Sequence, residues 1–300
     1  GVMKEKTKKI QKLAEQGDAQ AQHELGLMYY QGEGGLEEDD LEAFKWFTKA
    51  AEQGHITAQY DLALMYYQGV GIDEDDSKAF KWFTKAADQG HAEAMFDLGE
   101  MYTQGQSVDE NHSTGLKYIT KAANTGFVDA QYYLGFAYLT CGDVDGEYEL
   151  NIEQDFNKSK KWFTKAAESG HAKAQFELAI MYKEGEGTEI DLDEAFYWNT
   201  QSAEQGYDKA QFNLGNWYRN KDTTDDDKKA FYWYKKAAKQ GLPQAEYLLG
   251  IAYHEGAGVK ANEEKTKEWL IKAMISGKED ARNYLIEIFG LAEDWMMEDE

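Results

Sequence analysis

The chain has 300 residues, of which 42% are hydrophobic, and its formal net charge is −24 at pH 7. Phosphate binding needs clustered cations, so this charge excludes nucleic acid as a partner. The charge is open to two interpretations: it serves solubility and helix capping, or it selects a protein or peptide partner of basic character. No run of about twenty apolar residues is present, which excludes insertion into a membrane. A single cysteine, Cys141, excludes an intramolecular disulfide framework.

A short segment similar to Ala-Ala-x-x-Gly recurs at steps of 37, 36, 36, 44, 36, 35 and 36 residues. A period of this size is typical of helix-pair solenoids, in which each unit buries its apolar face only against its neighbours. The unbroken period therefore favours one elongated domain over residues 1–300 rather than two ordinary domains. The closing glycines are Gly17, Gly54, Gly90, Gly126, Gly170, Gly206, Gly241 and Gly277.

The predicted elements begin with a lysine-rich N-terminal cap over residues 1–16, helical from residue 3. Seven repeats follow over residues 17–276. In the second repeat, apolar spacing predicts a helix over 56–68, and Asp75, Asp76 or Ser77 is expected to cap a second helix that ends before Gly90. In the third repeat, Gly115 stands at a helical alanine position, and we expect it to weaken its helix by about 1 kcal/mol.

The fourth repeat is longer than the others, because about eight extra positions lie within residues 140–157. Insertions in repeat proteins map to loops, and often to a binding face. We expect this insertion to lie outside the repeat core. The chain then ends in a C-terminal cap and acidic tail over 277–300, with a single helix predicted at 278–289.

Two aromatic columns recur at fixed positions of the repeat. Aromatic residues at helical spacing are more often packing than a cofactor site, so we interpret both columns as core. The first column is Trp46, Trp82, Tyr118, Trp162, Trp198, Trp233 and Trp269, and the second is Tyr29, Tyr66, Tyr102, Tyr138, Tyr182, Tyr218 and Tyr253.

Units such as AQHELGLMYYQGEG followed by LEAFKWFTKAAEQG resemble the Sel-one-like repeat, a relative of the tetratricopeptide repeat, and the resemblance covers about residues 10–290. It implies an all-α fold, a right-handed α/α superhelical solenoid of about seven antiparallel helix pairs with terminal capping helices. The first helix of each pair would line the concave side. The resemblance implies no enzymatic activity, because the family acts mainly in protein-protein adaptors and, in bacteria, in host-interaction or signalling factors.

Under this correspondence, two sets of first-helix residues face the concave groove. The aromatic row is His23, Tyr60, Phe96, Tyr132, Phe176, Phe212 and Tyr247; the variable row is Leu27, Leu64, Glu100, Phe136, Ile180, Asn216 and Ile251. Both rows are open to two interpretations, packing between adjacent first helices or partner binding. We expect Lys173, Lys183, Lys209 and Arg219 to add positive charge around the apolar residues of the later repeats.

Two functions remain open at this point. The first is a non-catalytic adaptor that binds a peptide or protein domain in the groove and is a monomer alone. The alternative is a dedicated inhibitor or immunity protein that neutralises a basic toxin, with the acidic insertion speeding encounter through Asp143, Asp145, Glu147 and Glu149. The compartment stays open: cytoplasmic, or periplasmic or secreted if a signal peptide preceded Gly1.

Local patterns do not indicate catalysis, a cofactor or a metal. The acidic turns between paired helices lack the ligand spacing of an EF-hand loop. His55, His91 and His171 each follow a closing glycine, so they share one position in different repeats and cannot converge on one metal. We expect these histidines to act at the start of the first helix of a pair instead.

Overall fold

The computed structural model describes residues 1–144, 148–221 and 223–290, and the chain forms two compact units, Gly1–Asp155 and Phe156–Glu300. The boundary between the units falls within the predicted insertion at 140–157. The prediction of a single solenoid over residues 1–300 therefore stays a prediction, and each unit is described by itself.

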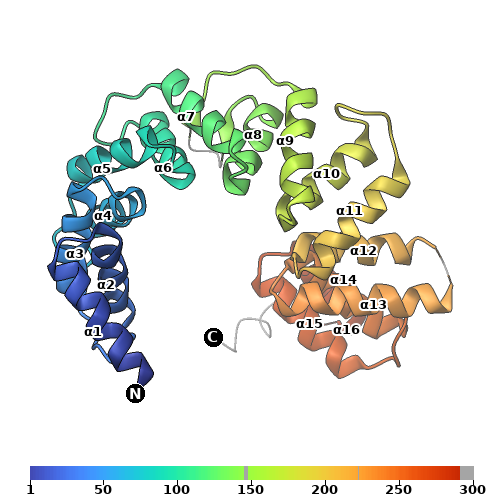
Figure 1. Ribbon diagram of the computed structural model, residues 1–300. Helices are drawn as coiled ribbons and strands as arrows, with labels where there is room; N and C mark the ends of the chain where they lie inside the picture. Colours follow the sequence, from blue (N-terminus) through green and yellow to red (C-terminus); the bar gives the residue numbers. More distant parts are fainter. Residues whose placement is uncertain (145–147, 222, 291–300) are drawn as a thin grey trace. The chain divides into compact units, whose positions relative to one another are not determined.

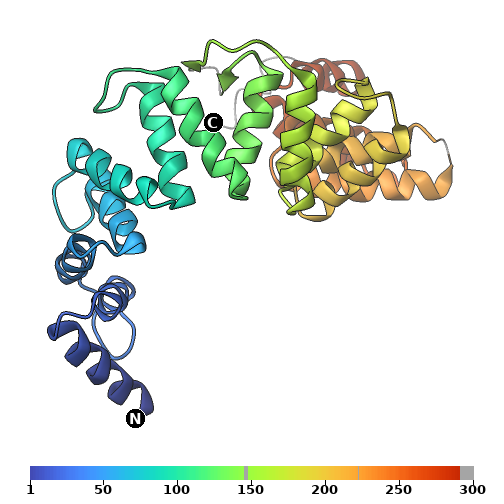
Figure 2. The ribbon, with the colours of Figure 1, turned by 45° about the horizontal axis from the view of Figure 1, so that its top comes forward.

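The first unit is a stack of helices in which α2 and α3, α4 and α5, and α6 and α7 pack as pairs (Figures 1 and 2). The helix α1 packs on α2, and a short antiparallel pair of strands follows α8. The elements are α1 Val2–Glu15, α2 Ala19–Gln31, α3 Asp40–Glu52, α4 Ile56–Gln68, α5 Asp76–Asp88, α6 Ala92–Gln104, α7 His112–Asn124, α8 Val128–Leu139, β1 Asp143–Val144 and β2 Tyr148–Glu149.

The second unit repeats this construction, with α10 and α11, α12 and α13, and α14 and α15 as its pairs, while α9 packs on α10 and α16 on α15. The predicted all-α solenoid of stacked helix pairs is confirmed. The elements are α9 Phe156–Glu168, α10 Ala172–Glu184, α11 Leu192–Glu204, α12 Asp208–Arg219, α13 Thr224–Lys239, α14 Pro243–Glu255, α15 Glu263–Ile275 and α16 Glu279–Phe289.

Local sequence explains where the helices begin and end. The Asp75 carboxylate accepts a hydrogen bond from the Lys78 N–H at 3.0 Å and so caps α5, as predicted. Gly90 follows the same helix with φ of 90°, a conformation that glycine adopts without steric cost. The predicted helix over 56–68 is α4.

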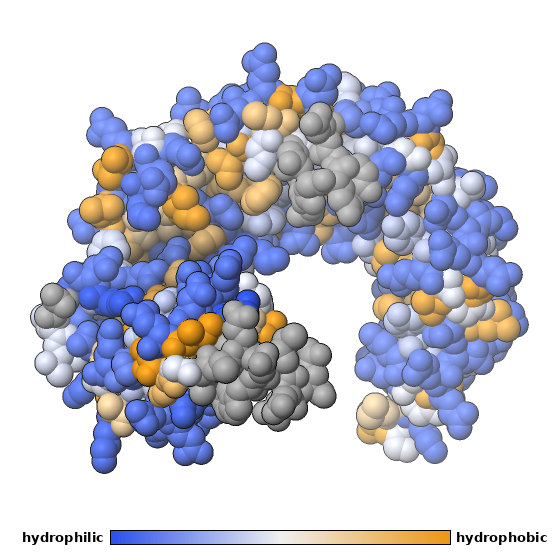
Figure 3. Space-filling model, turned by 180° about the vertical axis from the view of Figure 1, so that it is seen from behind, coloured by the Kyte–Doolittle hydropathy of each residue, from blue (hydrophilic) through white to orange (hydrophobic). Residues whose placement is uncertain are grey.

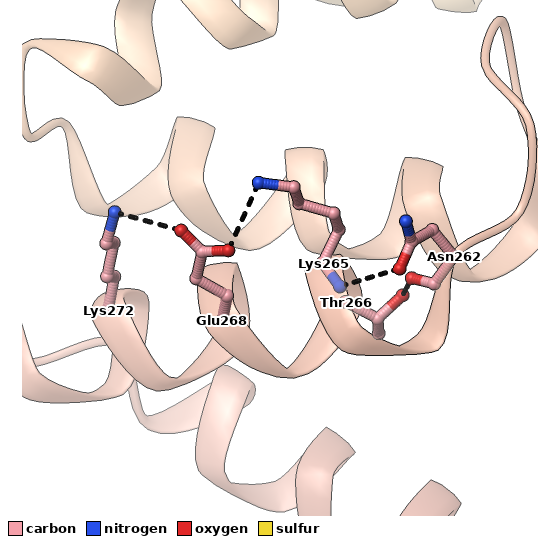
Figure 4. A network of polar contacts seen from close by, with 5 residues as sticks. All are labelled: Asn262, Lys265, Thr266, Glu268 and Lys272. Carbon is pink, nitrogen blue, oxygen red and sulfur yellow. Dashed lines mark hydrogen bonds and ion pairs between the residues drawn. The ribbon is translucent and has the colours of Figure 1, made fainter.

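In the second unit an asparagine performs the same function. The Asn262 side chain accepts from the Lys265 N–H at 3.0 Å at the start of α15 (Figure 4). Glu268 then pairs with Lys265 at 3.3 Å and with Lys272 at 3.6 Å on the exposed side of the helix. Such exposed pairs contribute at most about 1 kcal/mol each, so the cap and the buried face matter more to this helix.

The tryptophan column is core in part, and its environment differs along the chain. Trp82, Trp162 and Trp269 are buried, and the side-chain amines of Lys85, Lys165 and Lys272 lie 4.3–5.1 Å from their ring centroids. The prediction that both columns are core is wrong for Trp46, Tyr118, Trp198 and Trp233, and for every tyrosine of the second column except Tyr253, because these side chains are half-buried. The Trp198 indole N–H donates to Glu194 at 3.1 Å. The residue three positions after Trp198 is Gln201, so the lysine that stands at this position beside Trp82, Trp162 and Trp269 is replaced here.

Gly115 was expected only to weaken its helix, and the structure corrects this interpretation. A Cβ atom at Gly115 would lie 2.6 Å from the Gly99 carbonyl oxygen and 3.1 Å from the Thr103 nitrogen on α6. Gly115 therefore permits close contact between α6 and α7, and its absent side chain has a packing purpose.

The insertion also differs from its prediction, because it contributes to the core. Leu150 is 2% exposed, and its N–H donates to the Gly142 carbonyl oxygen at 3.1 Å. The terminal helices agree better with the sequence, since α1 and α16 match the predicted segments 3–16 and 278–289 to within one residue. The predicted acidic tail, from residue 291 onward, lies outside the described residues.

Candidate functional site

The first helices of the repeats carry the predicted binding residues. These helices are α2, α4, α6 and α8 in the first unit and α10, α12 and α14 in the second. We call the surface formed by the aromatic row and the variable row on these helices the first-helix face, and we treat its two parts separately.

Histidine side chains fix the start of several first helices. The Nδ1 atoms of His55, His91 and His171 accept hydrogen bonds from the N–H groups of Ala58, Ala94 and Ala174, each at 3.1 Å. The predicted role at the helix start is confirmed. Burial lowers the pKa of His55 and of His91, which favours the neutral ring that an accepting Nδ1 requires.

Rings of the aromatic row pack against the residue that starts the next first helix. His23 stacks on His55 with ring centroids 4.6 Å apart, and Tyr60 stacks on His91 at 4.5 Å. In the second unit Phe176 meets Tyr207 edge to face at 5.1 Å. Packing between repeats thus occupies part of this row.

The remaining members of the aromatic row are half-buried. Phe96 packs edge to face with Phe127 at 5.6 Å, Tyr132 lies 6.0 Å from Phe136, and Tyr247 meets Tyr284 at 6.1 Å. Phe212 lies 6.0 Å from Tyr234. A binding role for Tyr60, Phe96, Tyr132, Phe176, Phe212 and Tyr247 stays a prediction.

Acidic residues directly after the aromatic row form a feature that the sequence interpretation missed. The His23 Nε2 atom lies 2.6 Å from the Asp61 carboxylate, and the Tyr60 hydroxyl donates to Asp97 at 3.1 Å. Each bond links one first helix to the next. The signal was present in the sequence, because both acids follow the aromatic row by one residue at the repeat period.

Burial perturbs two of the carboxyl groups on this face. It raises the pKa of Asp97 to about 6, although the hydrogen bond from Tyr60 opposes the rise, and Glu93 and Asp129 add to it. Burial also raises the pKa of Glu177 to about 7, with Lys209 opposing and Glu186 adding. Both groups therefore change charge near neutral pH.

The variable row lies beside two small cavities, one in each unit. Leu27 and Leu64 line a cavity of about 110 Å³ together with Tyr30, which is 41% exposed. In the second unit Ile180 and Asn216 line a cavity of about 160 Å³. The surface of the variable row therefore contains two cavities, each about the size of one side chain.

Exposed cationic residues lie on the first helices of the second unit. Lys173, Lys183, Lys209 and Arg219 are exposed on α10 and α12, at the positions where the sequence predicted positive charge. Figure 3 shows hydrophilic side chains over much of the face that it displays, with apolar side chains in separate patches.

The four acidic residues of the insertion can be placed only in part. Asp143 and Glu149 are register partners of the β1–β2 pair, whereas Asp145 and Glu147 lie outside the described residues. Their predicted contribution to partner encounter stays a prediction.

Neither a metal site nor a membrane span is found among the described residues. Among the described residues, no group of three His, Cys, Asp or Glu side chains could hold a metal ion. In the same part of the chain, no helix combines the length and apolar character needed to span a membrane.

Comparison with known proteins decides the family. The Sel1 repeat model matches residues 19–55, 56–91, 92–127, 128–171, 172–207, 208–242 and 243–274. The chain belongs to the Sel1 repeat family. Proteins built from Sel1 repeats are generally non-catalytic scaffolds that bind other proteins.

Solved structures agree with this assignment. The chain is similar to a Sel1 repeat protein from Oxalobacter formigenes at 32% identity, covering 95% of this chain and 80% of that one, with a TM-score of 0.73. It is also similar to a protective antigen of uropathogenic Escherichia coli strains that displays this repeat fold, at 32% identity, 97% and 68% coverage and a TM-score of 0.56. A search of curated proteins finds no match.

Proposed function

We propose that this Sel1 repeat protein is a non-catalytic scaffold that binds a protein or peptide partner of basic character on its first-helix face. The observation that carries the proposal is the pair of side-chain-sized cavities on the variable row, one beside Leu64 and one beside Ile180. Binding energy at protein interfaces concentrates where a partner's side chain fills a pocket. The net charge of −24 favours a basic partner through long-range attraction.

The test compares how strongly the wild-type protein and its variants bind the partner protein. Phe136→Ala and Ile180→Ala each remove an apolar side chain from the variable row, and each is expected to weaken binding about tenfold or more once a partner is identified by mass spectrometry. Both side chains are half-buried, and Ile180 packs against a core cluster that includes Phe176 and Leu214, so some loss of stability is expected and binding is measured well below the melting temperature of each variant.

Tyr232→Ala provides the matched control, because Tyr232 is 51% exposed on the second helix α13. This variant should bind like the wild type. If Phe136→Ala and Ile180→Ala both bind normally, the variable row is packing and the proposal fails. Capture of one tight partner that loses its own activity would favour the inhibitor over the adaptor.

A further inference from the structure

The second helices α11 and α13 share the segment Ala-Phe-Tyr-Trp, and in both of them its tyrosine and tryptophan rings stand nearly at right angles. In α11 the ring centroids of Tyr197 and Trp198 lie 5.0 Å apart at an interplanar angle of 77°. In α13 those of Tyr232 and Trp233 lie 5.1 Å apart at 82°. We call each pair of rings an aromatic corner. Both corners lie at the surface, because Tyr197 and Tyr232 are 52% and 51% exposed.

The aromatic corner of α13 holds a lysine of its own helix. The side-chain amine of Lys236 lies 4.9 Å from the Tyr232 ring centroid and 5.5 Å from the Trp233 ring centroid. A cation within about 6 Å of a ring centroid is attracted to the negative face of the ring. Two rings in this arrangement therefore seat one ammonium group between them.

The aromatic corner of α11 keeps the two rings but has Gln201, which carries no charge, at the position of Lys236. In the six other repeats a lysine stands three residues after the tryptophan or tyrosine of this column, and its amine lies 4.3–5.8 Å from the ring centroid. These rings belong to Trp46, Trp82, Tyr118, Trp162, Trp233 and Trp269. The fifth repeat thus lacks the lysine that completes this arrangement elsewhere.

The charges around the two corners are opposite in sign. Five positions that carry lysine in α13 carry an acidic or neutral residue in α11. These residues of α11 are Asp193, Glu194, Thr200, Gln201 and Glu204, and their counterparts in α13 are Lys228, Lys229, Lys235, Lys236 and Lys239. The Glu194 carboxylate also accepts the Trp198 indole N–H at 3.1 Å, which fixes a negative charge beside the rings. The helix α11 therefore offers two rings and a carboxylate to a cation, while its own sequence supplies neither lysine nor arginine.

We infer that the aromatic corner of α11 binds one lysine side chain of a protein partner. The ammonium group lies against Tyr197 and Trp198, as that of Lys236 lies against its two rings in α13, and Glu194 supplies the opposite charge. A planar guanidinium stacks on one ring face, whereas a compact ammonium meets two rings at 77°, so the corner favours lysine over arginine. The corner is on a second helix, so it is a site separate from the first-helix face, although a partner of basic character suits both.

The experiment uses Nα-acetyl-lysine methylamide as the charged probe and its Nε-acetyl form, which has no charge, as the neutral probe. Indole N–H signals are recorded by NMR at constant ionic strength on the full chain labelled with ¹⁵N-tryptophan, and Trp198→Phe assigns the Trp198 signal. We expect the charged probe to shift this signal saturably with a Kd of about 10–100 mM, the affinity of a single cation on partly exposed rings. The neutral probe should bind about fivefold or more weakly, and the corresponding arginine compound should also bind more weakly than the charged probe.

Variants of α11 test the corner itself. Gln201→Lys supplies the lysine that the other repeats carry, so it should fill the corner and weaken binding of the charged probe at least about fivefold. Glu194→Gln keeps an oxygen that can accept the Trp198 indole N–H but removes the charge, so it should weaken the charged probe and leave the neutral probe unchanged. Glu204→Gln is the matched control, because it removes one exposed acid from the same helix away from the rings, and it should bind like the wild type. If Gln201→Lys does not fold, the comparison of Glu194→Gln with Glu204→Gln provides the second test.

Absence of a saturable Trp198 shift in the wild type, or equal binding by Gln201→Lys, would overturn the site. Equal affinity for the neutral probe would overturn the recognition of a cation, and tighter binding of the arginine compound would overturn the choice of lysine. The probes need no partner, so the aromatic corner can fail while the variants of the variable row still show partner binding, and the two proposals are tested separately.

Discussion

At the scale of single residues, Asp97 shows how the first-helix face combines burial with charge. Its carboxyl group accepts the Tyr60 hydroxyl at 3.1 Å and lies near Glu93 and Asp129. Burial and these two acids disfavour the ionised form, whereas the hydrogen bond favours it. The outcome is a pKa of about 6 instead of the usual 3.8.

This pKa predicts how Asp97 changes stability with pH. Below about pH 4 the group is protonated in both the folded and the unfolded chain. Between about pH 4 and 6 the unfolded chain releases the proton while the folded chain keeps it, so the contribution of Asp97 to stability falls as pH rises. Above pH 6 both forms are ionised and the loss is complete.

Asp97→Asn removes the ionisation but keeps an oxygen that can accept from Tyr60. We expect the variant to gain stability relative to the wild type as pH rises from 4 to 6, by on the order of 2 kcal/mol, and to hold that gain at pH 7.5. Urea unfolding of both proteins across this range measures the difference, in which contributions from other acids cancel. A difference that is constant with pH would contradict the assignment.

At the scale of helices, the contact between α6 and α7 depends on two glycines. A Cβ atom at Gly99 would lie 2.8 Å from the Gly115 carbonyl oxygen, and one at Gly115 would lie 2.6 Å from the Gly99 carbonyl oxygen. Both obstacles are backbone atoms, which cannot move aside as a flexible side chain can. Any side chain at either position must separate the helices.

Gly115→Ala is therefore expected to destabilise the protein by about 1–3 kcal/mol through overpacking, even though alanine favours a helix by about 1 kcal/mol. Thermal unfolding measures the change. Lys117→Ala, on the exposed side of the same helix, should stay within about 0.5 kcal/mol of the wild type. A Gly115→Ala variant at least as stable as the wild type would show that α6 and α7 have room to spare.

The helices were predictable from the sequence because local residues determine their ends. Asp75 caps α5 and Gly90 follows it, and both features can be recognised within a few residues. The contacts of the candidate site were not predicted, because they join residues about one repeat apart: Asp61 meets His23, and Asp97 meets Tyr60. The cavity beside Ile180 and Asn216 also needed the structure, because its walls come from three helices, α10, α11 and α12.

At the scale of the whole molecule, charge is the property most relevant to a partner. The net charge of −24 is spread over both units, and the insertion adds Asp143, Asp145, Glu147 and Glu149 within seven residues. Long-range attraction of this kind speeds the encounter with a basic protein more than it strengthens the final complex. Salt should therefore act mainly on the association rate.

We predict that the association rate with a basic partner falls at least about tenfold between low salt and 1 M salt, where the Debye length is about 3 Å. Deleting residues 143–149 should reduce the low-salt rate and leave the dissociation rate unchanged. The deletion keeps Leu150, because this side chain is buried and its loss would disturb the core.

A variant with Asp143→Asn, Asp145→Asn, Glu147→Gln and Glu149→Gln is the control, since it removes the same charges but keeps the length of the insertion. It should associate as slowly as the deletion variant if charge is the cause. Stopped-flow mixing at several salt concentrations measures all three rates. If the neutral variant associates like the wild type while the deletion variant is slow, the insertion acts through its shape; if both match the wild type at every salt concentration, it plays no part in encounter, and the acidic surface elsewhere must account for any salt dependence.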